Sequence, residues 1–550
     1  MKRRLLSLFV AFLFLFALIA GCTQESVPET TPTPTQDSKA ATTPKTESKL
    51  EEKAEVSGFK LPIVEEMVSF DVWISGSPPA TTRLKNEDEN ISIQAVEKLT
   101  NVHINRIRPS GASDQEAFNL SITSGDYPDS YITNPNYYIG GFDKYIEDNI
   151  IIDLSGYVEY FPNYQNIRLT NDDTRRRTIT DTGKIPGLFE IKKTVQPSFV
   201  GLVTREDLLN EFGLDKPRTY QEYHDLLVRF RDYGISRPLL ISSTGMEDGM
   251  MAGYGVAWSN YNGFIQVNGK VKFCPLEPGF KDYLTMMNQW YSEGLIDQNF
   301  VAYPGPFDYS ITSSGDTGIW STLYTIIGVT EANASDIEGF KLTTLTPPVK
   351  NLGDKRYMTI YNQSNTLLSD GIETITVACD NVEILLRYYD FFFTEEGSLY
   401  LNYGVEGVTY NMVDGKPVWT DLVLYDTEGY GSIYAIWGDY VYHGPKRWYD
   451  WERELLPTLP EVTLNAAKDW DANFVDEYTL PDVSVSTEDS ARYTSILNDA
   501  NTFINESVAK FITGVTPLSE FDNFIETLKN MRIEEAIEIK QAAYDRYMAR

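Results

Sequence analysis

The sequence predicts an α/β protein built from two lobes, each with a parallel, helix-covered sheet. The chain has 550 residues, more than one hydrophobic core normally supports, so two lobes are expected. Short strand-like stretches alternate with stretches that have the apolar spacing of helices, which is the order that gives parallel strands covered by helices. The same alternation starts again in the middle of the chain, which indicates a second lobe of the same kind.

The first lobe is expected to begin near Leu61. Its predicted strands are residues 70–74, 102–107 and 130–133, and its predicted helices are residues 91–99 and 114–124. A turn-rich loop at 124–129 separates the second helix from the third strand.

The second lobe begins with a predicted strand at 199–204 and a short helix that Gly213 closes. Thr219 and Glu222 have the spacing of a capping box at the start of a helix that runs to about Tyr233. Further on we expect an amphipathic helix at 280–293, an aromatic helix at 382–403 broken near Gly397, and two long helices within 490–550.

Residues 1–21 are typical of an export signal, with a basic start and an apolar run at 5–20. Cys22 directly follows the small residues Ala20 and Gly21, and this resembles the bacterial lipoprotein box, which implies diacylation of the Cys22 thiol. An ordinary signal peptide with a chance cysteine is the alternative. Residues 22–57 are rich in Thr and Pro, with no aromatic residue, so a disordered, lipid-anchored tether on the outer face of the bacterial cell membrane is expected.

The net charge disfavours polyanionic partners. With 47 Lys and Arg against 79 Asp and Glu, the net charge is −32, which disfavours electrostatic binding to nucleic acid or to anionic lipid. Cys274 and Cys379 are the cysteines left beside Cys22, and their spacing leaves a disulfide and two buried thiols as equal alternatives.

No metal or cofactor is expected. The histidines are far apart in sequence and lack metal-ligand spacing. Asp172, Asp173 and Asp181 suggest calcium weakly, because the central Gly and terminal Glu of an EF-hand loop are missing. Ser507 and Lys510 have the S-x-x-K spacing of penicillin-recognising enzymes, but no K-T-G or S-D-N follows.

Several ordered stretches resemble one family. The stretches are SGDYPD at 124–129, VTREDLLNEFGL at 203–214, WYSEGLID at 290–297, DFFFTEEG at 390–397, YGVEGVTY at 403–410, FITG at 511–514 and EIKQAAYDRY at 538–547. In this order they are similar to the extracellular solute-binding lipoproteins of carbohydrate ABC transporters, in the LplA-like or aldouronate-type branch of family 1. GKIPGLF at 183–189 departs from the family's GKIYGLP at Pro186, where the family has tyrosine, and at Phe189, where it has proline.

The resemblance implies a class II periplasmic-binding-protein-like fold: two αβα lobes joined by a hinge of crossing strands. It places 58–200 and about 355–430 in the N-terminal lobe, and 201–354 and about 431–550 in the C-terminal lobe. Crossings are expected at 199–204 and 345–366, with a return near 425–437. A monomer that closes on an oligosaccharide and delivers it to ABC permease subunits, without chemistry of its own, is implied.

A sugar cleft needs flat aromatic surfaces for C–H faces and polar groups for hydroxyls. The candidate ligand-binding residues are Trp258, Trp320, Tyr324, Trp437, Trp73, Tyr127, Asp129 and Glu406. Core packing is the alternative for the aromatic residues, turn capping for Asp129, and a buried ion pair for Glu406.

Two other function classes stay open from sequence. A secreted glycoside hydrolase or lyase would also use many aromatic and carboxylate side chains. A sensor or adhesin could use the same fold without a transporter.

Overall fold

The computed structural model describes residues 55–56, 59–76, 83–109, 113–258, 262–303, 309–357, 367–430, 433–442, 447–472 and 474–550. The predicted signal segment, Cys22 and most of the predicted tether lie outside these ranges. The chain divides into the units 1–53 and 54–550, and all the described helices and strands belong to the second unit. None of the described helices is long and apolar enough to cross a bilayer.

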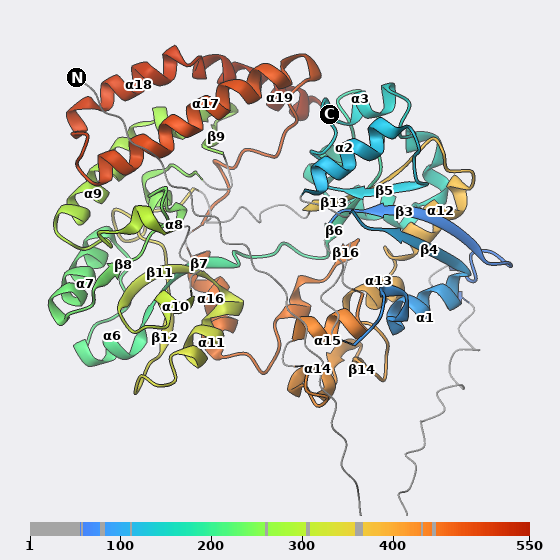
Figure 1. Ribbon diagram of the computed structural model, residues 1–550, viewed down its shortest axis with the longest axis horizontal. Helices are drawn as coiled ribbons and strands as arrows, with labels where there is room; N and C mark the ends of the chain where they lie inside the picture. Colours follow the sequence, from blue (N-terminus) through green and yellow to red (C-terminus); the bar gives the residue numbers. More distant parts are fainter. Residues whose placement is uncertain are drawn as a thin grey trace, which may run out of the picture. The chain divides into compact units, whose positions relative to one another are not determined.

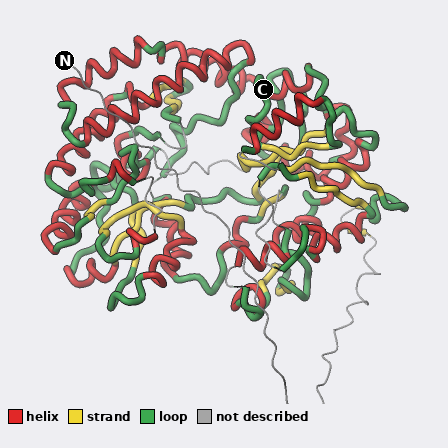
Figure 2. Tube along the Cα trace, in the orientation of Figure 1, coloured by secondary structure: helices red, strands yellow, loops and turns green. Residues whose placement is uncertain are grey.

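Two separate sheets organise the described chain (Figures 1 and 2). The first sheet has the order β16 (Trp448–Tyr449), β6 (Leu188–Lys192), β13 (Leu367–Ile375), β5 (Ser130–Thr133), β3 (Val68–Ile74) and β4 (Val102–Ile107). The second has the order β12 (Leu342–Leu345), β7 (Val200–Arg205), β11 (Thr317–Leu323) and β8 (Arg237–Leu239). We call the parts of the chain around them the first and the second lobe.

The sheets are mixed rather than wholly parallel. β3 runs parallel to β4 and β5, as expected, and β11 runs parallel to β8. However, β13 is antiparallel to both of its neighbours, and so is β7. The two antiparallel strands lie beside the points where the chain passes from one sheet to the other.

Helices surround each sheet. Those of the first lobe are α1 (Ile91–Thr100), α2 (Asp114–Ser124), α3 (Gly141–Glu147), α4 (Pro162–Arg168), α5 (Asp172–Arg177), α12 (Val382–Phe391), α13 (Glu395–Asn402), α14 (Asp421–Tyr425) and α15 (Ile433–Tyr440). Those of the second lobe are α6 (Glu206–Phe212), α7 (Tyr220–Tyr233), α8 (Asp248–Met251), α9 (Pro278–Ser292), α10 (Tyr309–Thr312), α11 (Tyr324–Asn333), α16 (Glu461–Trp470), α17 (Thr487–Ile512), α18 (Phe521–Asn530) and α19 (Ile533–Ala549). Three hairpins complete the described strands: β1 (Glu55–Val56) with β2 (Phe59–Lys60), β9 (Phe264–Val267) with β10 (Lys270–Phe273), and β14 (Tyr410–Val413) with β15 (Lys416–Trp419).

Local sequence signals place many elements correctly. β4, α2 and β5 have the expected bounds, and the capping box of Thr219 and Glu222 is present at the start of α7. The aromatic stretch 382–403 forms two helices, since the Thr394 hydroxyl accepts the Gly397 N–H and so caps α13 anew. The tail holds three helices instead of two.

The predicted boundary near residue 431 is wrong. β16 pairs with β6 in the first sheet, with Trp448 opposite Ile191. Trp437 of α15 packs beside Trp419 in a hydrophobic cluster of the first lobe. The segment expected to return at 425–437 therefore stays with the first lobe, and the second lobe resumes at α16, which packs on β7 and β12.

The first crossing is also shifted. β7 is a strand of the second sheet, so residues 193–199 make the crossing. Of the second crossing, residues 358–366 lie outside the described ranges, but Arg356 is placed with the second lobe. Its buried guanidinium donates to the carbonyls of Trp470 (2.5 Å) and Ala472 (2.6 Å).

The two cysteines do not pair. Cys274 packs in the core of the second lobe and Cys379 in that of the first, and both are free thiols. Burial raises the pKa of each thiol to about 12, so neither is a reactive thiolate near neutral pH.

A buried ion pair fixes the edge of the first sheet. The Arg447 guanidinium lies 2.6 Å from the Glu373 carboxylate, and the two residues are 4% and 1% exposed. The same guanidinium stacks 4.3 Å from the Phe392 ring centre. Because Ile191 donates its N–H to the Arg447 carbonyl (2.6 Å), the pair ties residues 447–449 to β6 and β13.

Arg447→Met should destabilise the protein by about 3–5 kcal/mol, because Glu373 loses its buried partner. Burial already raises the pKa of Glu373 to about 8, and without Arg447 the carboxyl must take up a proton near neutral pH. The double variant R447M/E373M should recover much of this loss, since both ionisable groups of the pair are then replaced by apolar side chains. Urea unfolding followed by circular dichroism measures both, with Lys510→Met, at an exposed pair with Glu506, as the control. A single variant as stable as the parent would contradict this role of the pair.

Candidate ligand-binding site

In α/β lobes, ligands bind at the carboxyl ends of parallel strands. In the first sheet this edge follows β3, β4 and β5. Arg108, just after β4, donates two hydrogen bonds to the Glu87 carboxylate, both of 2.9 Å, and a third to the Ser75 carbonyl (3.3 Å). Asp114 accepts the N–H of Gly76. The loops that follow β3 and β4 are thus held together by polar side chains.

Sequence reasoning missed Arg108 and Asp114. A usable signal existed, because an arginine directly after a strand that is parallel to its neighbours stands at the edge where these sites form. The candidates were chosen mainly as aromatic residues, and this criterion does not select Arg108 or Asp114.

Trp73 belongs to the core, not to a cleft loop. It is 5% exposed, and its ring packs against Phe118 and Tyr131 with centroids 5.9 Å and 6.0 Å away. Tyr127 packs against the same cluster and keeps part of its surface exposed.

Asp129 lies at the opposite edge from the one expected. It precedes β5, and β5 runs parallel to β3, so residue 129 is at the amino end of the strand. Its carboxylate accepts the Asp71 N–H (2.8 Å), while burial raises the pKa of the carboxyl. The contact that the structure gives Asp129 therefore links β5 to β3.

Trp320 and Tyr324 are buried in the second lobe. Trp320 on β11 is 1% exposed and packs in a cluster with Trp470, so the prediction that it faces ligand is wrong for this structure. Tyr324 begins α11, and its hydroxyl donates to the Glu454 carboxylate (2.8 Å). Glu454 ends a 3₁₀ helix in the segment between β16 and α16, so Tyr324 contacts the third passage of the chain between lobes.

Trp437 and Glu406 also lie elsewhere. Trp437 is 2% exposed, between the Trp419 ring and the Arg453 guanidinium, which is 4.3 Å from its ring centre. Glu406 is exposed in the turn before β14, so the expected burial of its charge is wrong. Neither side chain shares a site with the other candidates.

Trp258 is partly exposed. It packs at the rim of the second-lobe core beside Phe273, with ring centroids 6.2 Å apart, and its backbone N–H donates to the Asp248 carboxylate (2.6 Å). Residues 259–261, which follow it, lie outside the described ranges. Trp258 and Tyr127 are the aromatic candidates that are partly exposed rather than buried, and the ligand role of both stays a prediction.

The candidate calcium carboxylates are engaged by basic side chains. Asp181 accepts from Arg546 (2.7 Å) and Arg550 (2.6 Å) of the α19 end, and Asp173 pairs with Arg177 (2.9 Å). Among the described residues no group of three or more His, Cys, Asp or Glu is placed to hold a metal ion. The contacts of Asp181 instead connect the loop after α5, in the first lobe, to α19, in the second.

Comparison with known proteins agrees with the geometry, although a scan of family profiles finds no match. The chain is 22% identical to the lipoprotein LipO of Bacillus subtilis over 62% of this chain and 69% of that protein. It is 22% identical to the fructooligosaccharide ABC transporter substrate-binding protein FusA of Streptococcus pneumoniae, over 84% of this chain and 88% of FusA.

Among solved structures, the alginate-binding protein AlgQ2 without calcium ion matches with a TM-score of 0.68 and 21% identity, over 88% of this chain and 99% of AlgQ2. The fold is therefore the two-lobed fold of periplasmic solute-binding proteins. The comparisons confirm the resemblance to solute-binding proteins of carbohydrate ABC transporters.

Asp181→Asn should lower the free energy of unfolding by about 1 kcal/mol at pH 7, because a carboxylate bridging two partly exposed arginines is lost. Burial raises the pKa of Asp181, but the hydrogen bonds from Arg546 and Arg550 outweigh it, and the pKa in the folded protein lies below the usual value of an aspartate. The difference in free energy of unfolding between the parent and Asp181→Asn should have its full size above about pH 4. It should shrink as the pH falls through the pKa of Asp181 in the folded protein. Urea unfolding at several pH values measures it, with Asp172→Asn as the control; a difference that grows on acidification would contradict the assignment.

Proposed function

We propose that this protein is an extracellular, lipid-anchored solute-binding protein that captures an oligosaccharide between its lobes and hands it to an ABC importer. The proposal rests mainly on the structural match to the alginate-binding protein AlgQ2, since the match covers nearly the whole AlgQ2 chain. The relative FusA, matched over most of both chains, is a substrate-binding protein for fructooligosaccharides. Together they support a saccharide ligand and permease subunits as partners.

The way the lobes are connected supports a hinge mechanism. The chain passes between the sheets at residues 193–199, again between β12 and β13, and a third time before α16. Each sheet has its own hydrophobic core, so the lobes can rotate as bodies about these segments. Ligand that contacts both lobes would favour the closed state by its extra contacts there.

The proposed ligand contacts come from both lobes. The first lobe offers the loops after β3 and β4, where Ser75 and Arg108 lie, and the second offers the partly exposed Trp258. Arg108 can donate to hydroxyls, and Trp258 can stack on a sugar's C–H face. No residue is assigned a chemical step, because the neighbours are transport proteins.

The anchor is part of the proposal. LipO is a lipoprotein by name, and Cys22 follows a signal-like segment. Acylation there would hold the binding lobes at the outer face of the cell membrane.

A titration tests the function. Residues 54–550 should show saturable quenching of tryptophan fluorescence and a raised melting temperature with a member of a panel of fructan, uronate and neutral oligosaccharides. Trp258→Ala should weaken this binding about fivefold, since a stacked aromatic ring contributes roughly 1 kcal/mol. Tyr425→Ala, which removes an exposed ring of the first lobe, is the control.

The ligand should be recovered intact by chromatography. Cleavage products would contradict the transport role in favour of a hydrolase or lyase, and silence across the whole panel would contradict a saccharide ligand. Unchanged affinity in Trp258→Ala would remove that residue from the site.

A further inference from the structure

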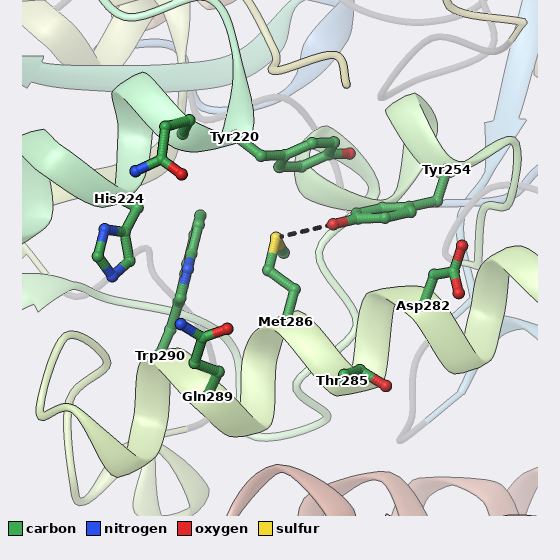
Figure 3. A pocket seen from close by; sticks show the side chains of 9 residues that line it. Tyr220, His224, Tyr254, Asp282, Thr285, Met286, Gln289 and Trp290 are labelled. Carbon is green, nitrogen blue, oxygen red and sulfur yellow. Dashed lines mark hydrogen bonds between the residues drawn. The ribbon is translucent and has the colours of Figure 1, made fainter. Parts of the chain in front are cut away.

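A second pocket lies on the second lobe, between α7 and α9 (Figure 3). Its volume is about 380 Å³, within the range of small-molecule sites. The side chains come from the facing surfaces of the two helices and from Tyr254. None of them belongs to a segment that connects the lobes, so this pocket is separate from the proposed ligand site.

A partnered carboxylate lies near each end of the row of side chains that lines the pocket. At one end the Glu293 carboxylate lies 2.6 Å from His224 Nε2 and accepts from the Gln289 amide (2.8 Å). At the other end Lys350 Nζ lies 3.0 Å from the Asp282 carboxylate and 4.8 Å from the centre of the Tyr254 ring. Because each carboxylate has a basic partner, the pocket favours a neutral ligand over an ion.

The floor of the pocket is apolar. The Tyr220 and Tyr254 rings lie side by side, with centroids 4.5 Å apart and planes tilted by 31°. Met286 and Trp290 continue this floor along α9, and both are largely buried. The Tyr220 hydroxyl donates to the Met250 carbonyl (2.6 Å) and the Tyr254 hydroxyl to the Met286 sulfur (3.2 Å), so both rings are fixed in place.

The rim is rich in hydrogen-bond acceptors. Thr285 donates its hydroxyl hydrogen to the Lys281 carbonyl (2.8 Å), so its oxygen is turned to accept. Gln221 and Gln289 donate their amide hydrogens to Asp225 and Glu293, which leaves acceptor capacity on their amide oxygens. A ligand with many hydroxyl donors and apolar C–H faces matches this rim and floor.

We propose that the pocket between α7 and α9 is a second binding site, for a neutral saccharide of one or two rings. This site goes beyond the proposed interlobe function and does not depend on it. Occupancy would leave hinge closure free, because the site lies within one lobe. The protein would then hold one sugar unit on its surface while another ligand is bound between the lobes.

Thr285→Trp tests the site by filling it from its exposed rim. The control is Thr502→Trp, since Thr502 is an exposed helical threonine with the same bond to a carbonyl one turn back. Saturation-transfer NMR with glucose, galactose, fructose, sucrose and maltose, each up to about 10 mM, measures binding to the parent and to both variants. Trp258→Ala is measured alongside to separate the two sites.

At least one sugar should bind saturably to the parent, to Thr502→Trp and to Trp258→Ala, and at least tenfold more weakly to Thr285→Trp. Binding that Thr285→Trp leaves unchanged would overturn the proposal, as would no saturable binding of any of these sugars. Failure here with intact oligosaccharide binding in the fluorescence titration would overturn the second site alone.

Discussion

The position of β13 in the first sheet determines the plan of the molecule. This strand lies between β5 and β6, yet the chain builds most of the second lobe between β6 and β13. Each lobe is therefore discontinuous, and the chain must cross between the sheets more than once. Buried arginines secure the ends of these crossings: Arg447 binds Glu373 of β13, and Arg356 binds carbonyls at the end of α16. Two bodies joined by a few strands are what hinge closure requires.

The sequence predicts the local elements well because their signals are local. The capping box at Thr219 needs only a few neighbouring residues, and the apolar spacing that predicts α1 lies within that helix. The boundary at residue 431 failed for the opposite reason. It depends on Trp437 packing against Trp419 and on Trp448 pairing with Ile191, and no local pattern reports these distant contacts.

Residue type alone was a poor guide to the site. A sugar platform and a core residue are both large aromatic side chains, and Trp320, Trp437 and Trp73 are core residues. Trp258 differs because it sits at the rim of its cluster. Arg108 was missed because its place at the carboxyl edge of the sheet, directly after β4, makes it a candidate, and the residues around it in sequence form no recognisable motif. The pocket between α7 and α9 could not be predicted from the sequence, because it exists only once both helices are packed side by side.

Closure of the two lobes on an intact saccharide is the central claim. Small-angle X-ray scattering of residues 54–550, with and without a saturating oligosaccharide that raises the melting temperature, measures it most directly. The radius of gyration should fall when the ligand binds, and the oligosaccharide should be recovered whole. An unchanged scattering profile at saturation would contradict the hinge mechanism, and so would a ligand that is recovered as fragments.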